Sequence, residues 1–139
     1  MIRAVLDTNV IVSGILKGNS PPGRLLGALL NGRFQAVTSA GLLSEVTRVL
    51  AYPKIRERYR VHPEAAEAVV ELLTLLSDQV EPQRVSWRAS RDPKDDPFVA
   101  CALQGDADYI VTGDQDLLTL KAFRGVQMVT AETFLKLLK

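Results

Sequence analysis

Short apolar segments rich in β-branched residues alternate along this chain with longer stretches of helical periodicity. Strand-like patterns cover 2–6, 34–38, 109–112 and 126–130, with a short extended segment at 79–85. Helical patterns cover 10–16, 24–30, 39–52, 54–77 (divided at His62-Pro63), 96–104, 113–120 and 131–139. The run GNSPPG at 18–23 is expected to break the first helix, and 86–95 is expected to be a surface loop. Strands alternating with helices predict an α/β domain with a mostly parallel central sheet flanked by helices.

The chain has 139 residues, which fits one domain spanning 1–139 with a substantial core. Its net charge is +1 and 24% of its residues are charged. These values exclude a disordered chain and a strongly basic coat for nucleic acid. Composition alone therefore leaves the substrate open.

The single cysteine and the amino-terminal segment bear on the compartment. Cys101 lies in the apolar run FVACAL and has no second cysteine to pair with, so we interpret it as a small core residue in a reducing compartment. Arg3 and Asp7 interrupt the first apolar stretch, which excludes a signal peptide or membrane span there. We expect a cytoplasmic protein.

Two acids directly follow predicted strands. Asp7 comes after 2–6, and Asp114 comes after 109–112. Parallel α/β sheets bind ligands at the carboxyl ends of their strands, so both acids fall where such folds place their chemistry. Capping of the next helix is the alternative role for Asp114, whereas Asp7 is expected to gain little there beyond turn formation.

Two further acids can reach the same edge. Glu45 lies one helical turn from Leu42 and from Val49, at the border of the buried stripe, although a solvated helix position is the alternative. Asp96, before Pro97, stands at a helix start that leads into the strand 109–112, and capping is again the alternative. We predict that all four carboxylates converge.

Converging carboxylates repel one another, and their charged forms persist only where a cation compensates. The chain has one histidine, one cysteine and no HExxH motif, so it lacks the usual zinc ligands, while carboxylate oxygens suit Mg²⁺ or Mn²⁺. These ions activate water and stabilise the transition state of an in-line displacement at phosphorus. Phosphodiester hydrolysis is the reaction that fits.

Four blocks of sequence resemble a PIN domain over essentially the whole chain. They are VLDTNVIVSG at 5–14, the helical Glu45, DPKDDPFVACAL at 92–103 and ADYIVTGDQDLL at 107–118. The resemblance is closest to small prokaryotic proteins grouped as toxin components of toxin-antitoxin systems. It implies cleavage of single-stranded RNA with one or two Mg²⁺ or Mn²⁺ ions, an antitoxin partner, and a homodimer or higher oligomer.

The resemblance also assigns roles. It implies that Asp7, Glu45, Asp96 and Asp114 are the catalytic acids and metal ligands, with Asp116 as a further outer ligand. Asn9 and Thr112 are similar to the polar residues that hold the first carboxylate in such sites.

Basic residues bracket these acids and are candidates for holding an RNA backbone; the alternative is an ordinary solvated charged surface. Arg48, Arg88, Arg91 and Lys94 are the main candidates, and Lys54, Arg56, Arg58, Arg60 and Arg84 are further ones. Trp87 either stacks a base or packs beneath a loop.

Two other functions remain open. A haloacid-dehalogenase-like phosphatase shares an opening acid and a late Gly-Asp pair, but it needs an acid two residues after the nucleophile, where this chain has Asn9. A non-catalytic PIN-like module that binds RNA or a partner is the second alternative; the presence of all four acids argues against it.

Overall fold

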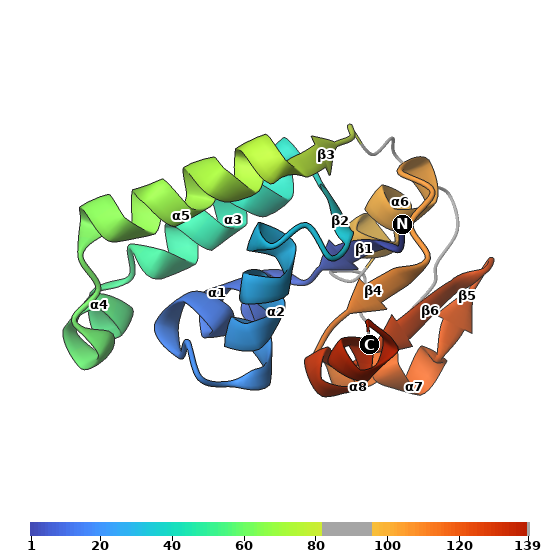
Figure 1. The fold of residues 1–139 in the computed structure, drawn as a ribbon. Helices are drawn as coiled ribbons and strands as arrows, with labels where there is room; N and C mark the ends of the chain where they lie inside the picture. The colour runs from blue at the N-terminus through green and yellow to red at the C-terminus, as the bar shows by residue number, and fades with distance from the viewer. Residues whose placement is uncertain (82–95, 139) are drawn as a thin grey trace.

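The computed structural model describes residues 1–81 and 96–138 (Figure 1). The elements in chain order are β1 Arg3–Leu6, α1 Thr8–Leu16, α2 Pro21–Leu30, β2 Gln35–Thr38, α3 Ala40–Leu50, α4 Pro53–Tyr59, α5 Pro63–Leu76, β3 Ser77–Gln79, α6 Asp96–Gln104, β4 Tyr109–Val111, α7 Gln115–Leu120, β5 Ala122–Phe123, β6 Val126–Val129 and α8 Ala131–Leu137. The trace shows α3 and α5 running side by side, with α4 at their far end (Figure 1).

The six strands form one sheet in the order β3-β2-β1-β4-β6-β5. All neighbouring pairs are parallel except β5 with β6, which is antiparallel. The predicted α/β fold with a mostly parallel sheet is therefore confirmed. The chain winds outward from β1 to β2 and β3, then returns to β4 on the other side of β1. This reversal of strand order between β1 and β4 is the position where doubly wound sheets form their ligand crevice.

A separate hydrophobic core covers each face of the sheet. Because side chains alternate along a strand, Ala4 and Leu6 of β1 face one core and Val5 faces the other. The first core includes Phe34 and Phe134, whose rings pack edge to face with centroids 5.1 Å apart. Leucine, valine and alanine side chains from α1, α2, α3 and α5 complete that core, and α6 and α7 cover the other face.

Cys101 lies in the second core and has no exposed surface, which confirms its interpretation as a core residue. Burial in apolar surroundings raises the pKa of its thiol to about 12. The thiol is therefore protonated at neutral pH.

Some element boundaries differ from the sequence prediction. Helix α2 begins at Pro21, inside the run expected to break the helix, because proline suits the first helical turn and Ser20 caps it. The short strand β3 begins at Ser77, two residues before the extended segment was expected. The two-residue strand β5 was not predicted, because a segment that short carries no periodicity.

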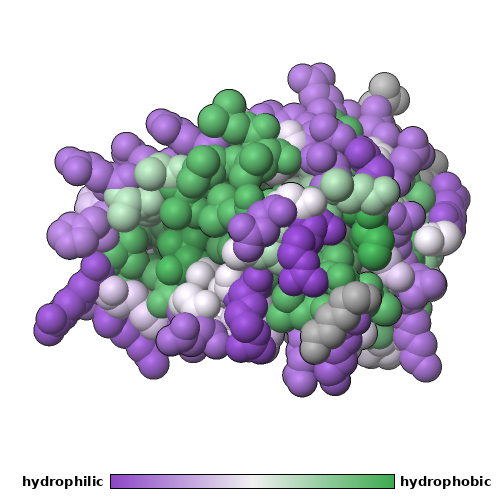
Figure 2. Space-filling view, in the orientation of Figure 1, coloured by the Kyte–Doolittle hydropathy of each residue, from purple (hydrophilic) through white to green (hydrophobic). Residues whose placement is uncertain are grey.

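Within the part of the chain that the structure describes, no helix has both the length and the apolar character needed to cross a bilayer. Apolar side chains nevertheless gather on one exposed face, over α5 and the neighbouring helices (Figure 2). Leu72, Leu75 and Leu76 of α5 are 44%, 81% and 38% exposed, and we call these three residues the leucine patch.

Candidate active site

Several helices begin at the carboxyl edge of the sheet, immediately after a strand, and a polar side chain caps each one. Asp7 follows β1 and caps α1, Ser39 follows β2 and caps α3, and Asp114 follows β4 and caps α7. Each cap accepts a hydrogen bond from a backbone N–H of its helix. The capping alternative is thus confirmed for Asp114. The expectation that Asp7 gains only a turn was wrong, because α1 starts at the next residue.

Asp7 is the most deeply buried acid of this edge, with only 4% of its surface exposed. Burial raises the pKa of its carboxyl group, and the nearby Asp114 charge raises it further, while hydrogen bonds from Thr112 and from the Asn9 backbone act in the opposite direction. A protein gains nothing in stability from burying a carboxylate whose charge is incompletely compensated. The position is therefore suited to a cationic ligand.

Thr112 links the two strand-end acids. Its hydroxyl donates a hydrogen bond to Asp7 Oδ2 over 2.7 Å. The Thr112 hydroxyl oxygen in turn accepts a hydrogen bond from the backbone N–H of Asp114 over 3.0 Å. Thr112 is 1% exposed, so this connection is shielded from water. The prediction that Thr112 holds the first carboxylate agrees with this geometry. Asn9 contributes its backbone N–H, which donates to Asp7 Oδ1 over 3.1 Å.

A pocket of about 610 Å³ opens at this edge, and we call it the acidic pocket. Its wall includes three acids from different parts of the chain: Asp7, which follows β1, Glu45 of α3, and Asp114, which follows β4. The other described lining residues are Thr8, Asn9, Ser39, Gly41, Leu42, Arg48, Pro97 and Phe98. Three of the four predicted acids therefore share one pocket at the strand-order reversal.

Glu45 is half-buried and engaged by an arginine one turn further along α3. Arg48 Nη2 donates to both oxygens of Glu45, over 2.5 and 2.6 Å, and Arg48 Nε donates to Oε2 over 3.1 Å. Arg48 Nη1 also donates to Tyr52 Oη over 2.9 Å. The sequence placed Arg48 among the basic residues near the acids, but not in contact with one of them.

Most of the remaining predicted residues lie beside this pocket or outside the described chain. The further basic candidates belong to α4 and its C-cap and do not line the pocket; they are Lys54, Arg56, Arg58 and Arg60. Asp96 opens α6 one residue before Pro97, which lines the pocket, although Asp96 is not among the lining residues. Asp116 lies in the first turn of α7, and its N–H donates to Asp114 Oδ1 over 2.8 Å. Arg84, Trp87, Arg88, Arg91 and Lys94 lie outside the described residues.

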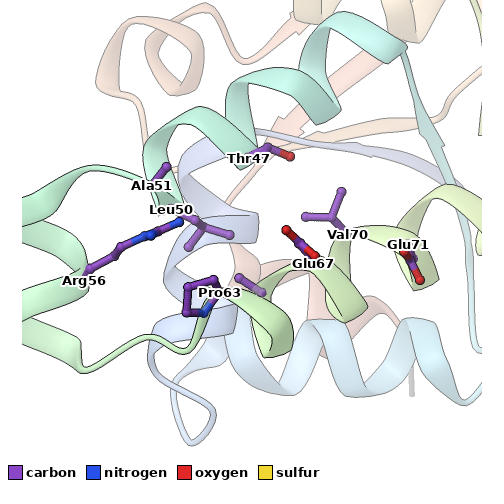
Figure 3. Close-up of a pocket in the computed structure, with 9 residues that line it drawn as sticks. Thr47, Leu50, Ala51, Arg56, Pro63, Glu67, Val70 and Glu71 are labelled. Atoms are coloured by element: carbon purple, nitrogen blue, oxygen red, sulfur yellow. The ribbon is translucent and has the colours of Figure 1, made fainter.

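A second hollow of about 220 Å³ lies between α3, α4 and α5 (Figure 3). Leu50, Pro63 and Val70 form part of its wall, with Arg56 and Glu67 among the few charged groups. Its wall is largely apolar and it holds none of the four predicted acids. We therefore place the candidate chemistry in the acidic pocket.

A comparison with known protein families identifies the family of this chain. Residues 3–116 match the sequence model of the PIN domain. This chain belongs to the PIN domain family. An uncharacterized protein of Methanocaldococcus jannaschii is similar, with 28% identity over 120 residues that cover 86% of this chain and 76% of that protein. PIN domains are generally nucleases and typically bind divalent metals.

Six residues that line the acidic pocket were not predicted from the sequence as site residues: Thr8, Ser39, Gly41, Leu42, Pro97 and Phe98. Ser39 directly follows the second predicted strand, so its position after a strand was a usable signal. Phe98 belongs to the apolar run of α6, and only the structure shows that it also lines the pocket. The Thr8 hydroxyl is buried and has no hydrogen-bond partner among the described residues.

The oxygen ligands in the acidic pocket fit a hard divalent cation. Its described wall offers carboxylate and hydroxyl oxygens, which Mg²⁺ and Mn²⁺ prefer. Within residues 1–81 and 96–138, however, no three acidic, histidine or cysteine side chains already stand close enough to hold a metal ion. One acid of the pocket, Glu45, is already paired with Arg48.

Replacing Asp7 with Asn is expected to raise the melting temperature of the metal-free protein by about 2–4 °C at pH 7.5. Asn caps a helix as well as Asp, and the substitution removes a buried charge and its repulsion with Asp114. Because the pKa of Asp7 is raised on folding, the unfavourable charge develops as the pH rises through that value. The difference from wild type should therefore shrink in acid. Thermal unfolding in EDTA across this pH range measures it.

Asp106→Asn is the matched control, because Asp106 is exposed and Asn tolerates its left-handed backbone conformation. Its melting temperature should follow wild type. A lower melting temperature for Asp7→Asn at pH 7.5, or an equal rise for Asp106→Asn, would contradict the assignment of charge burial at Asp7.

Proposed function

We propose that this PIN domain is a metal-dependent endoribonuclease that hydrolyses phosphodiester bonds of single-stranded RNA. One observation carries the proposal: Asp7, Glu45 and Asp114 come from three separate parts of the chain and line one pocket where the strand order reverses. Family membership supports a nuclease, and the resemblance to small prokaryotic PIN proteins supports RNA as the substrate. Asp7, Glu45, Asp96 and Asp114 are the proposed ligands of one or two Mg²⁺ or Mn²⁺ ions, with Asp116 as an outer ligand.

The residues of the acidic pocket have distinct parts in this proposal. A bound divalent ion supplies charge compensation and a more acidic water. Thr112 and the Asn9 N–H fix both oxygens of Asp7 in place. Pro97 and Phe98 form an apolar part of the pocket wall. The volume of about 610 Å³ is within the range of sites for small ligands, which is enough for a nucleotide unit of a single strand.

The experiment is a cleavage assay on end-labelled single-stranded RNA with Mn²⁺, Mg²⁺ or EDTA. We expect internal cleavage with either ion and none in EDTA. Equal cleavage in EDTA would reject the metal-dependent mechanism. p-Nitrophenyl phosphate tests the phosphatase alternative, and its turnover without RNA cleavage would favour that function.

The non-catalytic module has one observation in its favour, namely the lack of a ready-made group of metal ligands among the described residues. It predicts that the protein binds RNA in Mn²⁺ without cutting it. The same assay therefore separates it from the nuclease.

We also propose that the protein forms a homodimer through the leucine patch (Figure 2) and acts in the cytoplasm as the toxin of a toxin-antitoxin pair. Adjacent exposed leucines are typical of an interaction surface, and Leu75 is 81% exposed. The toxin role and the antitoxin rest on the family resemblance, and the compartment rests on the single buried cysteine.

Leu75→Glu is expected to convert a dimer to a monomer, because it places a charge at the centre of the proposed apolar interface. Light scattering coupled to size-exclusion chromatography measures the mass of each form. Leu137→Glu in α8 is the control, since Leu137 is also exposed, at 44%, and lies outside the patch. A monomeric wild type, or a dimer that persists in Leu75→Glu, would refute this interface.

A further inference from the structure

We infer that Arg48 competes with the metal ion for Glu45, so that metal binding releases this arginine toward the RNA backbone. The inference rests on the proposed function. Before an ion binds, the proposed ligand Glu45 is already paired with Arg48.

The contacts of Glu45 carry the first step. Two nitrogens of the Arg48 guanidinium bind the Glu45 carboxylate, and both of its oxygens accept. This two-pronged pairing is the strongest geometry available between an arginine and a carboxylate. A cation that uses Glu45 as a ligand must approach the oxygens where the guanidinium now lies. Metal and arginine therefore compete for the same carboxylate.

The surroundings of Arg48 carry the second step. Its Nη1 donates to Tyr52 Oη over 2.9 Å, and the guanidinium carbon lies 5.8 Å from the centre of the Tyr52 ring. Tyr52 lies beyond the end of α3 and is 41% exposed. When Glu45 binds the metal instead of Arg48, the contacts with Tyr52 keep the Arg48 guanidinium close to its present position. Arg48 also lines the acidic pocket, so the released charge remains at its wall.

Charge balance gives the release a consequence. Without metal, Arg48 offsets part of the negative charge of the pocket. A divalent ion takes over that compensation and leaves the guanidinium without its carboxylate partner. A phosphate offers the same paired oxygens as the lost carboxylate. The pocket thereby acquires its backbone-binding arginine only in the metal-loaded protein.

Calorimetric titration of the full chain with Mn²⁺, in the absence of RNA, tests the competition. Arg48→Met keeps most of the side-chain length and removes the charge. It should tighten Mn²⁺ binding about two- to fivefold, since an exposed pair contributes modestly. In the Glu45→Gln background the same substitution should tighten Mn²⁺ binding by less than in wild type, because the competition no longer exists and only the repulsion by the Arg48 charge at the pocket wall is removed.

Arg33→Met is the matched control for the loss of one positive charge. Arg33 is exposed, precedes β2 at the opposite edge of the sheet, and contacts the backbone carbonyl of Leu138. Salt screens its charge at that distance, so Mn²⁺ affinity should match wild type. Unchanged or weaker Mn²⁺ binding by Arg48→Met, with normal binding by wild type, would overturn the competition alone. Failure of every form to bind Mn²⁺ would overturn the proposed metal-dependent function and this inference with it.

Discussion

Asp7→Asn is expected to reduce Mn²⁺-dependent cleavage of single-stranded RNA about a thousandfold or more. The substitution removes one negative charge at the strand-order reversal. It keeps the size of the side chain and its ability to cap α1. The loss therefore reports on chemistry rather than on folding. Initial cleavage rates at saturating Mn²⁺ provide the measurement.

Stability and activity should change in opposite directions for this variant. The same charge that activity requires is unfavourable in the metal-free fold, because Asp7 is 4% exposed and lies near Asp114. Asp106→Asn, the exposed control, should leave both properties at wild-type values. If Asp7→Asn cuts RNA within tenfold of wild type, Asp7 is not a metal ligand of the nuclease.

The sequence predicts the layers of this fold well because each layer has a strong periodicity. β1, β2, β4 and β6 are short apolar segments between helical patterns, and the parallel sheet follows from their alternation. β5 has only two residues and pairs with β6 across Gly125, whose φ is 89°. No pattern in the sequence distinguishes such a strand from the turn beside it.

The residues of the candidate site also differ in how well the sequence predicts them. Asp7 and Asp114 were predictable because the carboxyl ends of parallel strands meet at one edge. Local geometry was less accessible, because rotamers decide whether Glu45 faces a cation or Arg48, and sequence spacing leaves both open. The capping role of Asp7 was missed because the helical pattern was placed at 10–16. Thr8 and Asn9, which form the first turn of α1, are residue types that also favour turns.

Thr112→Val is expected to lower cleavage about 10- to 100-fold and to destabilise the fold by about 1–3 kcal/mol. Valine matches threonine in shape but has no hydroxyl. Asp7 Oδ2 then loses its donor and the Asp114 N–H loses its acceptor, both beside a fully buried position. Asp7 keeps its charge but is no longer held in orientation, so a higher Mn²⁺ concentration should be needed for half-maximal activity. Rates across an Mn²⁺ titration, with urea unfolding, measure the two effects.

Thr112→Ser provides the control that separates the hydroxyl from the methyl group. Serine restores the donor to Asp7 and the acceptor for Asp114, so its Mn²⁺ requirement should return to that of wild type even though the lost methyl group costs some stability. A positional role for Thr112 predicts this rescue, because the hydroxyl acts only by fixing a carboxylate. If the serine and valine variants raise the Mn²⁺ concentration for half-maximal activity equally, the site depends on packing of the methyl group and not on the hydrogen bond to Asp7.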